Sequence, residues 1–72
     1  MSGYAEHGYD KAEGKVIRAT PKAILFRETK GEEYWVPQSQ IHENSEVWKE
    51  GDEGMIVVSA WFAKTKGWID EY

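Results

Sequence analysis

The stretch from Lys22 to Ile41 constrains the fold most, because it holds two apolar runs separated by the short segment TKG. β-branched and aromatic residues in such runs favour strands, and glycine in the connection favours a tight turn. The stretch therefore predicts a β-hairpin with strands over Ala23–Glu28 and Glu33–Pro37. Both faces of this hairpin carry apolar side chains, so each face needs a cover.

The turn chemistry selects the register of the hairpin. A two-residue loop at Lys30-Gly31 would place Glu28 opposite Glu33, and like charges facing each other are unfavourable. A three-residue loop over 29–31 puts glycine at the left-handed position that this turn requires. The resulting register pairs Arg27 with Glu33, Phe26 with Tyr34, Leu25 with Trp35, and Ile24 with Val36.

Period-two alternation then divides the hairpin side chains between two faces. In this register one face carries Ile24, Phe26, Tyr34 and Val36. The other face carries Ala23, Leu25 and Trp35. The hairpin itself does not decide which face is the core, so the second face is covered either by a helix near the C-terminus or by a partner.

Further strands are expected on both sides of the hairpin. A strand over 15–20 ends at Pro21, because proline cannot donate to a strand ladder. Residues 38–41 predict a turn or a single 3₁₀ turn that returns Ile41 to the core, and residues 47–48 predict a short strand or an anchor. The continuous apolar run over 55–58 predicts a strand at a central position of the sheet.

A short helix is predicted after the last strand. The hydroxyl of Ser59 is suited to accept an amide of the first helical turn, so Ser59 is the expected N-cap. The helix runs over 60–66 and ends at Gly67, a favourable C-terminal stop. Because so short a helix does not form alone, Trp61 and Phe62 are expected to hold it against the sheet.

Length limits the core that these elements enclose. A chain of 72 residues with no cysteine forms one small domain that no disulfide bond stabilises. Residues 1–13 are predicted to form a flexible N-terminal arm, and residues 14–72 a single domain. Trp68 and Ile69 are expected to continue as a docked tail or a last short strand. The predicted fold is mainly β: a small bent antiparallel sheet or partly open SH3/OB-like barrel of four or five strands, with one short C-terminal helix.

The charge is unevenly distributed along the chain. The formal net charge of −4 disfavours a general nucleic-acid binder. Residues 11–30 nevertheless carry six basic and two acidic residues, which gives +4, whereas residues 32–53 carry seven acidic residues and one lysine, which gives −6. These segments are either solvated faces that attract each other across the fold, or dedicated binding surfaces.

Aromatic and basic residues form the candidate binding site. Aromatic side chains on a hairpin face can stack nucleobases or enter a protein interface, and basic side chains can contact phosphates. The alternative is that the aromatic residues fill the core, although four Trp, four Tyr and two Phe exceed what one small barrel readily holds. The candidates are Tyr34, Trp35, Trp48, Arg18, Lys22, Arg27 and Lys30.

The sequence predicts no catalytic residue, no metal site and no cofactor. His7 and His42 lack further ligands at zinc-site spacing, and the acidic loop over 43–53 does not match a calcium-binding EF-hand loop. No phosphate-binding loop or GxGxxG is found, and the carboxylate pairs fall in turns. An enzyme is therefore not expected. No apolar run reaches the roughly 20 residues that a membrane helix requires, so no membrane partner is expected and a cytoplasmic protein is the default.

Three motifs resemble those of small uncharacterised domains encoded by phages and other bacterial mobile elements. They are K-A-I-L-F at 22–26, W-V-P-x-S-x-I at 35–41 and W-F-A-x-x-K-G at 61–67. The resemblance implies a bacterial or phage source and a small β-barrel with a terminal helix. Since those domains have no agreed activity, it implies no functional residue.

Two binding functions are carried forward from the sequence, and an enzyme is kept only as a residual alternative that would need a deep pocket with a strongly shifted carboxylate or histidine. The first is a non-catalytic module for protein–protein interaction or self-association, as in a mobile-element accessory protein, with the second hairpin face as its simplest contact. The second is a small barrel that binds single-stranded nucleic acid through the basic residues of 11–30 and the hairpin aromatics.

Overall fold

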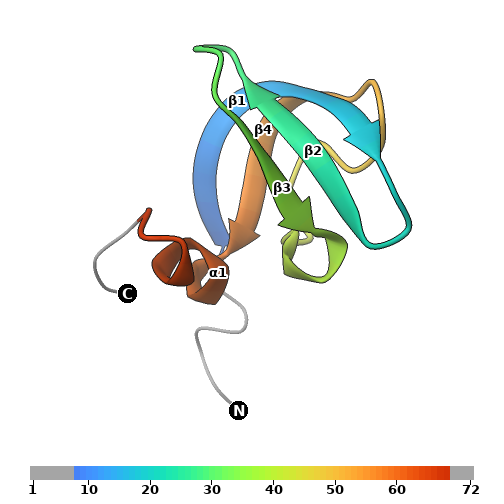
Figure 1. Ribbon diagram of the computed structural model, residues 1–72. Helices are drawn as coiled ribbons and strands as arrows, with labels where there is room; N and C mark the ends of the chain where they lie inside the picture. The colour runs from blue at the N-terminus through green and yellow to red at the C-terminus, as the bar shows by residue number, and fades with distance from the viewer. Residues whose placement is uncertain (1–7, 69–72) are drawn as a thin grey trace.

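The computed structural model describes residues 8–68 and shows an open, four-stranded antiparallel sheet with one short helix after the last strand (Figure 1). The predicted mainly-β fold with one short C-terminal helix is confirmed. In chain order the elements are β1 (Gly8–Ala19), β2 (Ala23–Glu28), β3 (Glu33–Pro37), the 3₁₀ turn η2 (Gln38–Gln40), β4 (Glu53–Ser59) and α1 (Ala60–Thr65). The strand order in the sheet is β3-β2-β1-β4.

β1 is long and curved, and it is shared by two strand ladders. Its first part pairs with β4 from Gly8 onward, and its last part pairs with β2 as far as Ala19. Gly14 belongs to both ladders, opposite Glu28 on one side and Gly54 on the other. Strand structure thus begins earlier than predicted, because residues 8–13 of the expected arm are part of β1; residues 1–7 of that arm lie outside the described residues.

The hairpin has the predicted register. β2 and β3 pair through Arg27–Glu33, Phe26–Tyr34, Leu25–Trp35 and Ile24–Val36. Gly31 has a φ of 110°, as the three-residue loop requires. The structure also shows which face is the core, because Ile24, Phe26 and Val36 are completely buried.

The core lies between this hairpin face, β4 and α1. Its fully buried members also include Val16, Val47, Ile56 and Val58, and the helix contributes Phe62 and Ala63. Ile41 returns to the core as predicted and makes an isolated bridge with Val58. Val47 is an anchor within a loop and not a short strand.

The predicted central position of β4 is wrong, because β4 lies at the edge of the sheet. The loop that precedes β4 covers its outer edge. The His42 amide donates to the carbonyl of Val57 over 2.8 Å, and the Glu46 amide donates to the carbonyl of Met55 over 3.0 Å. Val57 is therefore only 5% exposed, and a buried edge strand has the same continuous apolar sequence as a central one.

The helix begins and ends as its capping residues predict. The Ser59 hydroxyl accepts a hydrogen bond from the Phe62 amide over 3.1 Å. Gly67, which follows the C-terminal end of the helix, has a φ of 81°. The Trp68 amide then donates to the carbonyl of Ala63 over 2.8 Å, which holds Trp68 against the helix. The predicted tail residue Ile69 lies outside the described residues.

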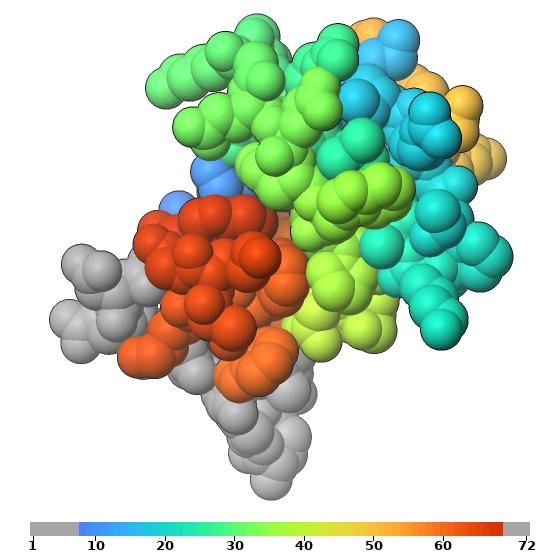
Figure 2. Space-filling view, in the orientation of Figure 1, coloured from blue at the N-terminus to red at the C-terminus, as the bar shows by residue number. Residues whose placement is uncertain are grey.

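One of the two expected covers of the second hairpin face was the helix, and α1 does not cover that face. The Trp68 ring lies against Tyr34, with 5.0 Å between ring centroids, and against Phe62, with 5.6 Å. Both neighbours belong to the core side, so Trp68 packs against the core. On the surface, α1 and the segment after it lie next to β3 (Figure 2). Within residues 8–68, no element of the fold lies over the second face of the hairpin.

Candidate functional site

The uncovered surface of β1, β2 and β3 is the main candidate site, and we call it the outer face. It is defined by the six residues Lys15, Arg18, Leu25, Arg27, Glu33 and Trp35. The strand register places Arg18, Leu25 and Trp35 in one row across the three strands. Trp35 is 47% exposed, so a large apolar ring lies on this surface.

A second row of the outer face is charged. Lys15, Arg27 and Glu33 are neighbours across the three strands. The guanidinium of Arg27 pairs with Glu33 at 2.6 Å, whereas the Lys15 ammonium lies 3.8 Å from Glu53 of β4. Arg18 forms no ion pair with any described residue. Its charge is therefore available next to Leu25, which separates it from Trp35.

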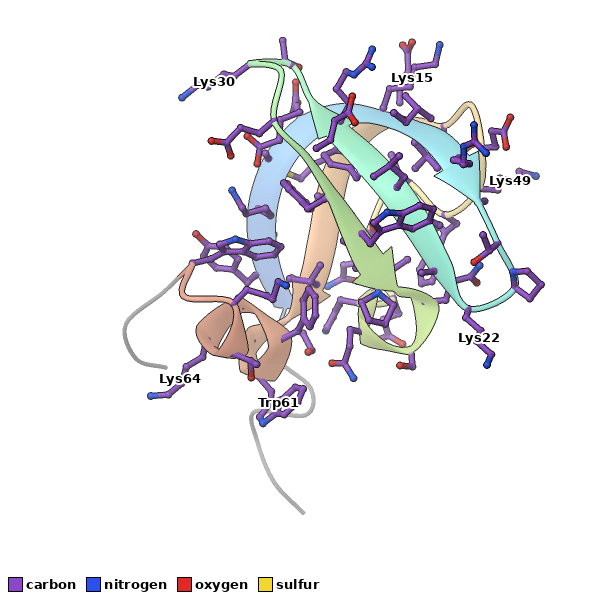
Figure 3. All side chains as sticks on the ribbon, in the orientation of Figure 1. Lys15, Lys22, Lys30, Lys49, Trp61 and Lys64 are labelled. Carbon is purple, nitrogen blue, oxygen red and sulfur yellow. The ribbon has the colours of Figure 1, made fainter. Side chains whose placement is uncertain are left out.

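Two predicted basic residues lie at the ends of the hairpin. Lys22 precedes β2 and Lys30 is in the turn that follows it, so they are at opposite ends of the strand (Figure 3). Both are exposed. Lys30 borders a hollow together with Lys11 and Glu28, so its charge lies near the core-side carboxylate of Glu28.

The structure separates two predicted aromatic residues from Trp35. Tyr34 is next to Trp35 in β3 and therefore points to the core side, where its ring lies 6.0 Å from that of Phe26. Trp48 comes from the loop before β4 and donates from Nε1 to the carbonyl of Ser45 over 2.9 Å; it is 40% exposed. The predicted platform is thus reduced to Trp35 with Leu25 and its basic neighbours.

A buried ionic group was missed by the sequence analysis. The Lys11 ammonium lies 2.7 Å from Oε2 of Glu28, and the Tyr34 hydroxyl donates to the same oxygen over 2.7 Å. The ammonium also lies 4.9 Å from the ring centroid of Trp68 and 5.5 Å from that of Tyr34. We call Lys11, Glu28, Tyr34 and Trp68 the Lys11 cluster.

One sequence signal pointed to this cluster. In the predicted register Glu28 shares a face with Phe26 and Ile24, because side chains two residues apart point the same way. That face is the core, and a carboxylate on it requires a cation or hydrogen-bond donors. The identity of the donor, Lys11, follows only from the pairing of β1 with β2.

The electrostatics of the cluster favour an ionised Glu28. Burial acts to raise the pKa of the Glu28 carboxyl, but the hydrogen bonds from Lys11 and Tyr34 outweigh burial and hold the pKa below its ordinary value. Burial and the bond to the Glu28 carboxylate together raise the pKa of Tyr34 above its ordinary value. At neutral pH the cluster therefore holds one cation, one carboxylate and a neutral phenol.

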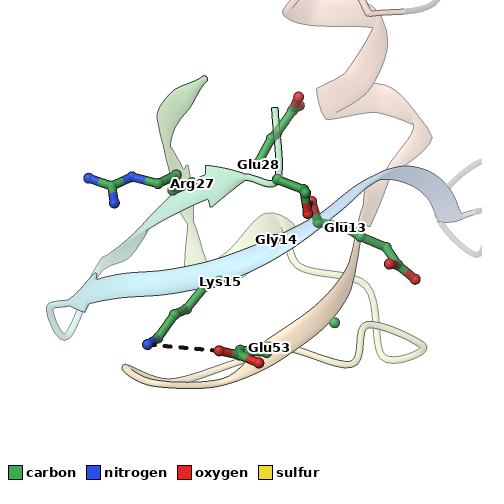
Figure 4. Close-up of a pocket in the computed structure, with 8 residues that line it drawn as sticks. Glu13, Gly14, Lys15, Arg27, Glu28 and Glu53 are labelled. Atoms are coloured by element: carbon green, nitrogen blue, oxygen red, sulfur yellow. Dashed lines mark hydrogen bonds and ion pairs between the residues drawn. The ribbon is translucent and has the colours of Figure 1, made fainter. Parts of the chain in front are cut away.

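A shallow hollow lies where β1 crosses from one ladder to the other. It has a volume of about 500 Å³ and is bordered by Gly14, Arg27, Thr29 and several acidic residues (Figure 4). Arg27 and Glu28 point to opposite sides of β2 here, and Lys15 turns toward Glu53. Among the described residues no group of three or more histidine and acidic side chains is placed to hold a metal ion.

Comparison with known proteins gives no match: neither a family model, nor a curated protein, nor a solved structure matches the chain. In the part of the chain that the structure describes, no helix has both the length and the apolar character needed to cross a membrane.

Proposed function

We propose that the protein is a cytoplasmic, non-catalytic binding module that acts through the outer face, and that its simplest partner is a second copy of the chain. One observation carries this proposal: Trp35 is 47% exposed in a row with Leu25 and Arg18, on a surface that no other described element covers. Exposed Trp and Arg side chains are enriched among the residues that dominate interface energetics. A phage or mobile-element source stays a prediction.

Charge complementarity supports a second copy as the partner. The outer face and the hairpin ends present Arg18, Lys22 and Lys30, whereas the loop over 42–52 presents the exposed acids Glu43, Glu46 and Glu50. The loop pairs with β4, at the other edge of the sheet from β3. A basic face and an acidic loop at different places on one molecule would associate in a head-to-tail manner.

Complementary charge reversals test this self-association. We expect the wild-type protein to show a concentration-dependent mass in size-exclusion chromatography with light scattering, weakening as salt rises. Arg18→Glu and Glu50→Lys should each reduce the mass to that of the monomer, and their mixture should form a one-to-one complex. Trp61→Ala is the matched control, because Trp61 is 46% exposed on α1 and outside the outer face.

A clean wild-type monomer at high concentration and low salt would remove self-association. If the mixture of the two charge-reversed variants also stays monomeric, head-to-tail pairing through the loop is wrong.

A second candidate function is the binding of single-stranded nucleic acid. It is favoured by the position of Arg18 in the same row as Trp35, on the far side of Leu25, since a stacked base contributes roughly 1–3 kcal/mol and a guanidinium on the same face can contact the nucleic-acid backbone. We expect Trp35→Ala to weaken binding of a labelled oligonucleotide by roughly 5- to 150-fold, with affinity falling steeply as salt rises. Fluorescence anisotropy measures the affinity of each variant and its dependence on salt. The absence of binding at low salt would remove this candidate.

A further inference from the structure

The Lys11 ammonium is enclosed by groups that recognise alkylammonium ions. Glu28 supplies a carboxylate at 2.7 Å, and the rings of Trp68 and Tyr34 supply aromatic surfaces at 4.9 and 5.5 Å. Aromatic rings within about 6 Å attract a cation through their quadrupoles, and a carboxylate adds a charge-assisted hydrogen bond. The Lys11 side chain is 17% exposed, so the enclosure still opens to solvent.

We propose that this cluster is an alkylammonium-binding site that the chain fills with its own Lys11, and that a lysine side chain of a partner can take the same position. Lys11 thus acts as a resident ligand that competes with the partner. The proposal is independent of the outer face, because Glu28, Tyr34 and Trp68 lie on the core side of the hairpin.

The walls of the site are held by contacts that do not need Lys11. The Tyr34 hydroxyl donates to Glu28 over 2.7 Å. Tyr34 is held in the β2–β3 ladder, and Glu28 pairs with Gly14 in the β1–β2 ladder. Trp68 is held by the hydrogen bond from its backbone amide to the carbonyl of Ala63 and by the edge-on contact of its ring with Phe62. A site vacated by Lys11 would therefore keep its carboxylate and both rings in place.

An exit path for Lys11 is present in the structure. A hollow of about 470 Å³ lies directly beside the ion pair and is bordered by Lys11, Ala12, Glu13, Glu28, Thr29 and Lys30. Rotation of the Lys11 side chain into this hollow would free the site without breaking the strand pairing of β1. Because the resident lysine must leave first, an external ligand binds more weakly to the wild type than to a protein without Lys11.

Removal of the resident lysine gives the direct test. We expect methylammonium chloride to shift the Trp68 indole N–H resonance of Lys11→Ala in a saturable manner, with an affinity roughly ten-fold or more above that for the wild type. Sodium chloride at equal ionic strength should not reproduce the shift. Lys15→Ala is the matched control, because Lys15 makes an exposed ion pair at 3.8 Å and should behave as the wild type.

Two further variants make the result specific. Glu28→Gln introduced into Lys11→Ala should abolish the saturable shift, whereas Trp35→Ala should leave it unchanged because Trp35 belongs to the outer face. The proposal is overturned if Lys11→Ala shows no saturable shift, or one equal to that of the wild type.

A second measurement uses the wild-type protein and covers the case in which Lys11→Ala does not fold. Excess N-acetyl-lysine methylamide should move the Nζ resonance of Lys11 toward that of a solvated lysine while the Lys15 resonance stays in place. An unmoved Lys11 resonance at saturating ligand would overturn the proposal.

Discussion

At Gly14 the backbone of β1 lies so close to β2 that there is no room for a side chain. The peptide of Gly14 lies against β2 so closely that a β-carbon would overlap the carbonyl oxygen of Arg27 and approach the Cα of Glu28 to 2.8 Å. Both obstacles are backbone atoms, which cannot move away as a flexible side chain can. Glycine is needed here for space, since Gly14 is not among the glycines with a positive φ.

Substitution at Gly14 should destabilise the protein strongly. We expect Gly14→Ala to lower the free energy of unfolding by at least about 3 kcal/mol, because β1 and β2 must separate to admit the methyl group. Urea denaturation measures this change. Gly51→Ala is the control: its φ is 94° but nothing lies within 4 Å, so only a strain of about 1–2 kcal/mol is expected. Equal losses in both variants would contradict the close approach at Gly14.

Glu28 should make the stability depend on pH. Its pKa in the folded protein is lowered, because the hydrogen bonds from Lys11 and Tyr34 outweigh burial. The folded state therefore binds the proton less readily than the unfolded state, whose Glu pKa is about 4.3. This contribution to the free energy of unfolding is present above that pH and is lost as the pH falls through the lower, folded pKa.

We expect Glu28→Gln to lose stability at neutral pH and to show a smaller further loss on acidification than the wild type. Urea denaturation from pH 7 to acid measures both effects, and Glu50→Gln in the exposed loop is the control. An acid dependence in Glu28→Gln equal to that of the wild type would show that Glu28 is not responsible.

At the scale of the elements, short-range chemistry explains what the sequence predicts well. The hairpin register follows from the repulsion of Glu28 and Glu33 and from the glycine of the turn, and both effects act within a few residues. The position of β4 could not be predicted in the same way, because residues 41–46 of the loop that precedes it cover its edge through contacts between residues 9 to 17 positions apart. The helix was predictable from its caps, but its docking side depends on where Trp68 finds apolar neighbours.

Ser59 couples the helix to the 3₁₀ turn. Its hydroxyl accepts the Phe62 amide over 3.1 Å and donates to Oε1 of Gln40 over 2.6 Å. We expect Ser59→Ala to lower the free energy of unfolding by about 1 kcal/mol, as is typical of a lost N-cap. Thermal denaturation followed by circular dichroism measures the change. The exposed Ser39 gives a control, Ser39→Ala, expected to change stability by less than about 0.5 kcal/mol; a similar loss in both variants would argue against a capping role.

At the scale of the whole molecule, the candidate sites depend on which hairpin face becomes the core. The sequence divides the side chains correctly, with Tyr34 and Trp35 on opposite faces, but either face was a possible core. The pairing of β1 with both neighbours decides between them, since Val16 is placed opposite Phe26 and Arg18 opposite Leu25. The same pairing brings Lys11 to Glu28; the hairpin register shows that Glu28 needs a donor, but no local pattern in the sequence identifies Lys11 as that donor.

The shared strand β1 also has a consequence for the order of folding. Its ladder with β2 closes a short connection between Ala19 and Ile24, whereas its ladder with β4 must close the whole chain segment between Lys15 and Glu53. Loop-closure entropy favours the local contacts first, so we expect a polarised transition state in which β1, β2 and β3 are paired and β4 is not. Val36→Ala should then slow folding, and Val58→Ala should mainly accelerate unfolding, as measured by stopped-flow chevron analysis. High φ-values in β4 would contradict this order; low ones would mean that β1 is only half paired at the rate-limiting step.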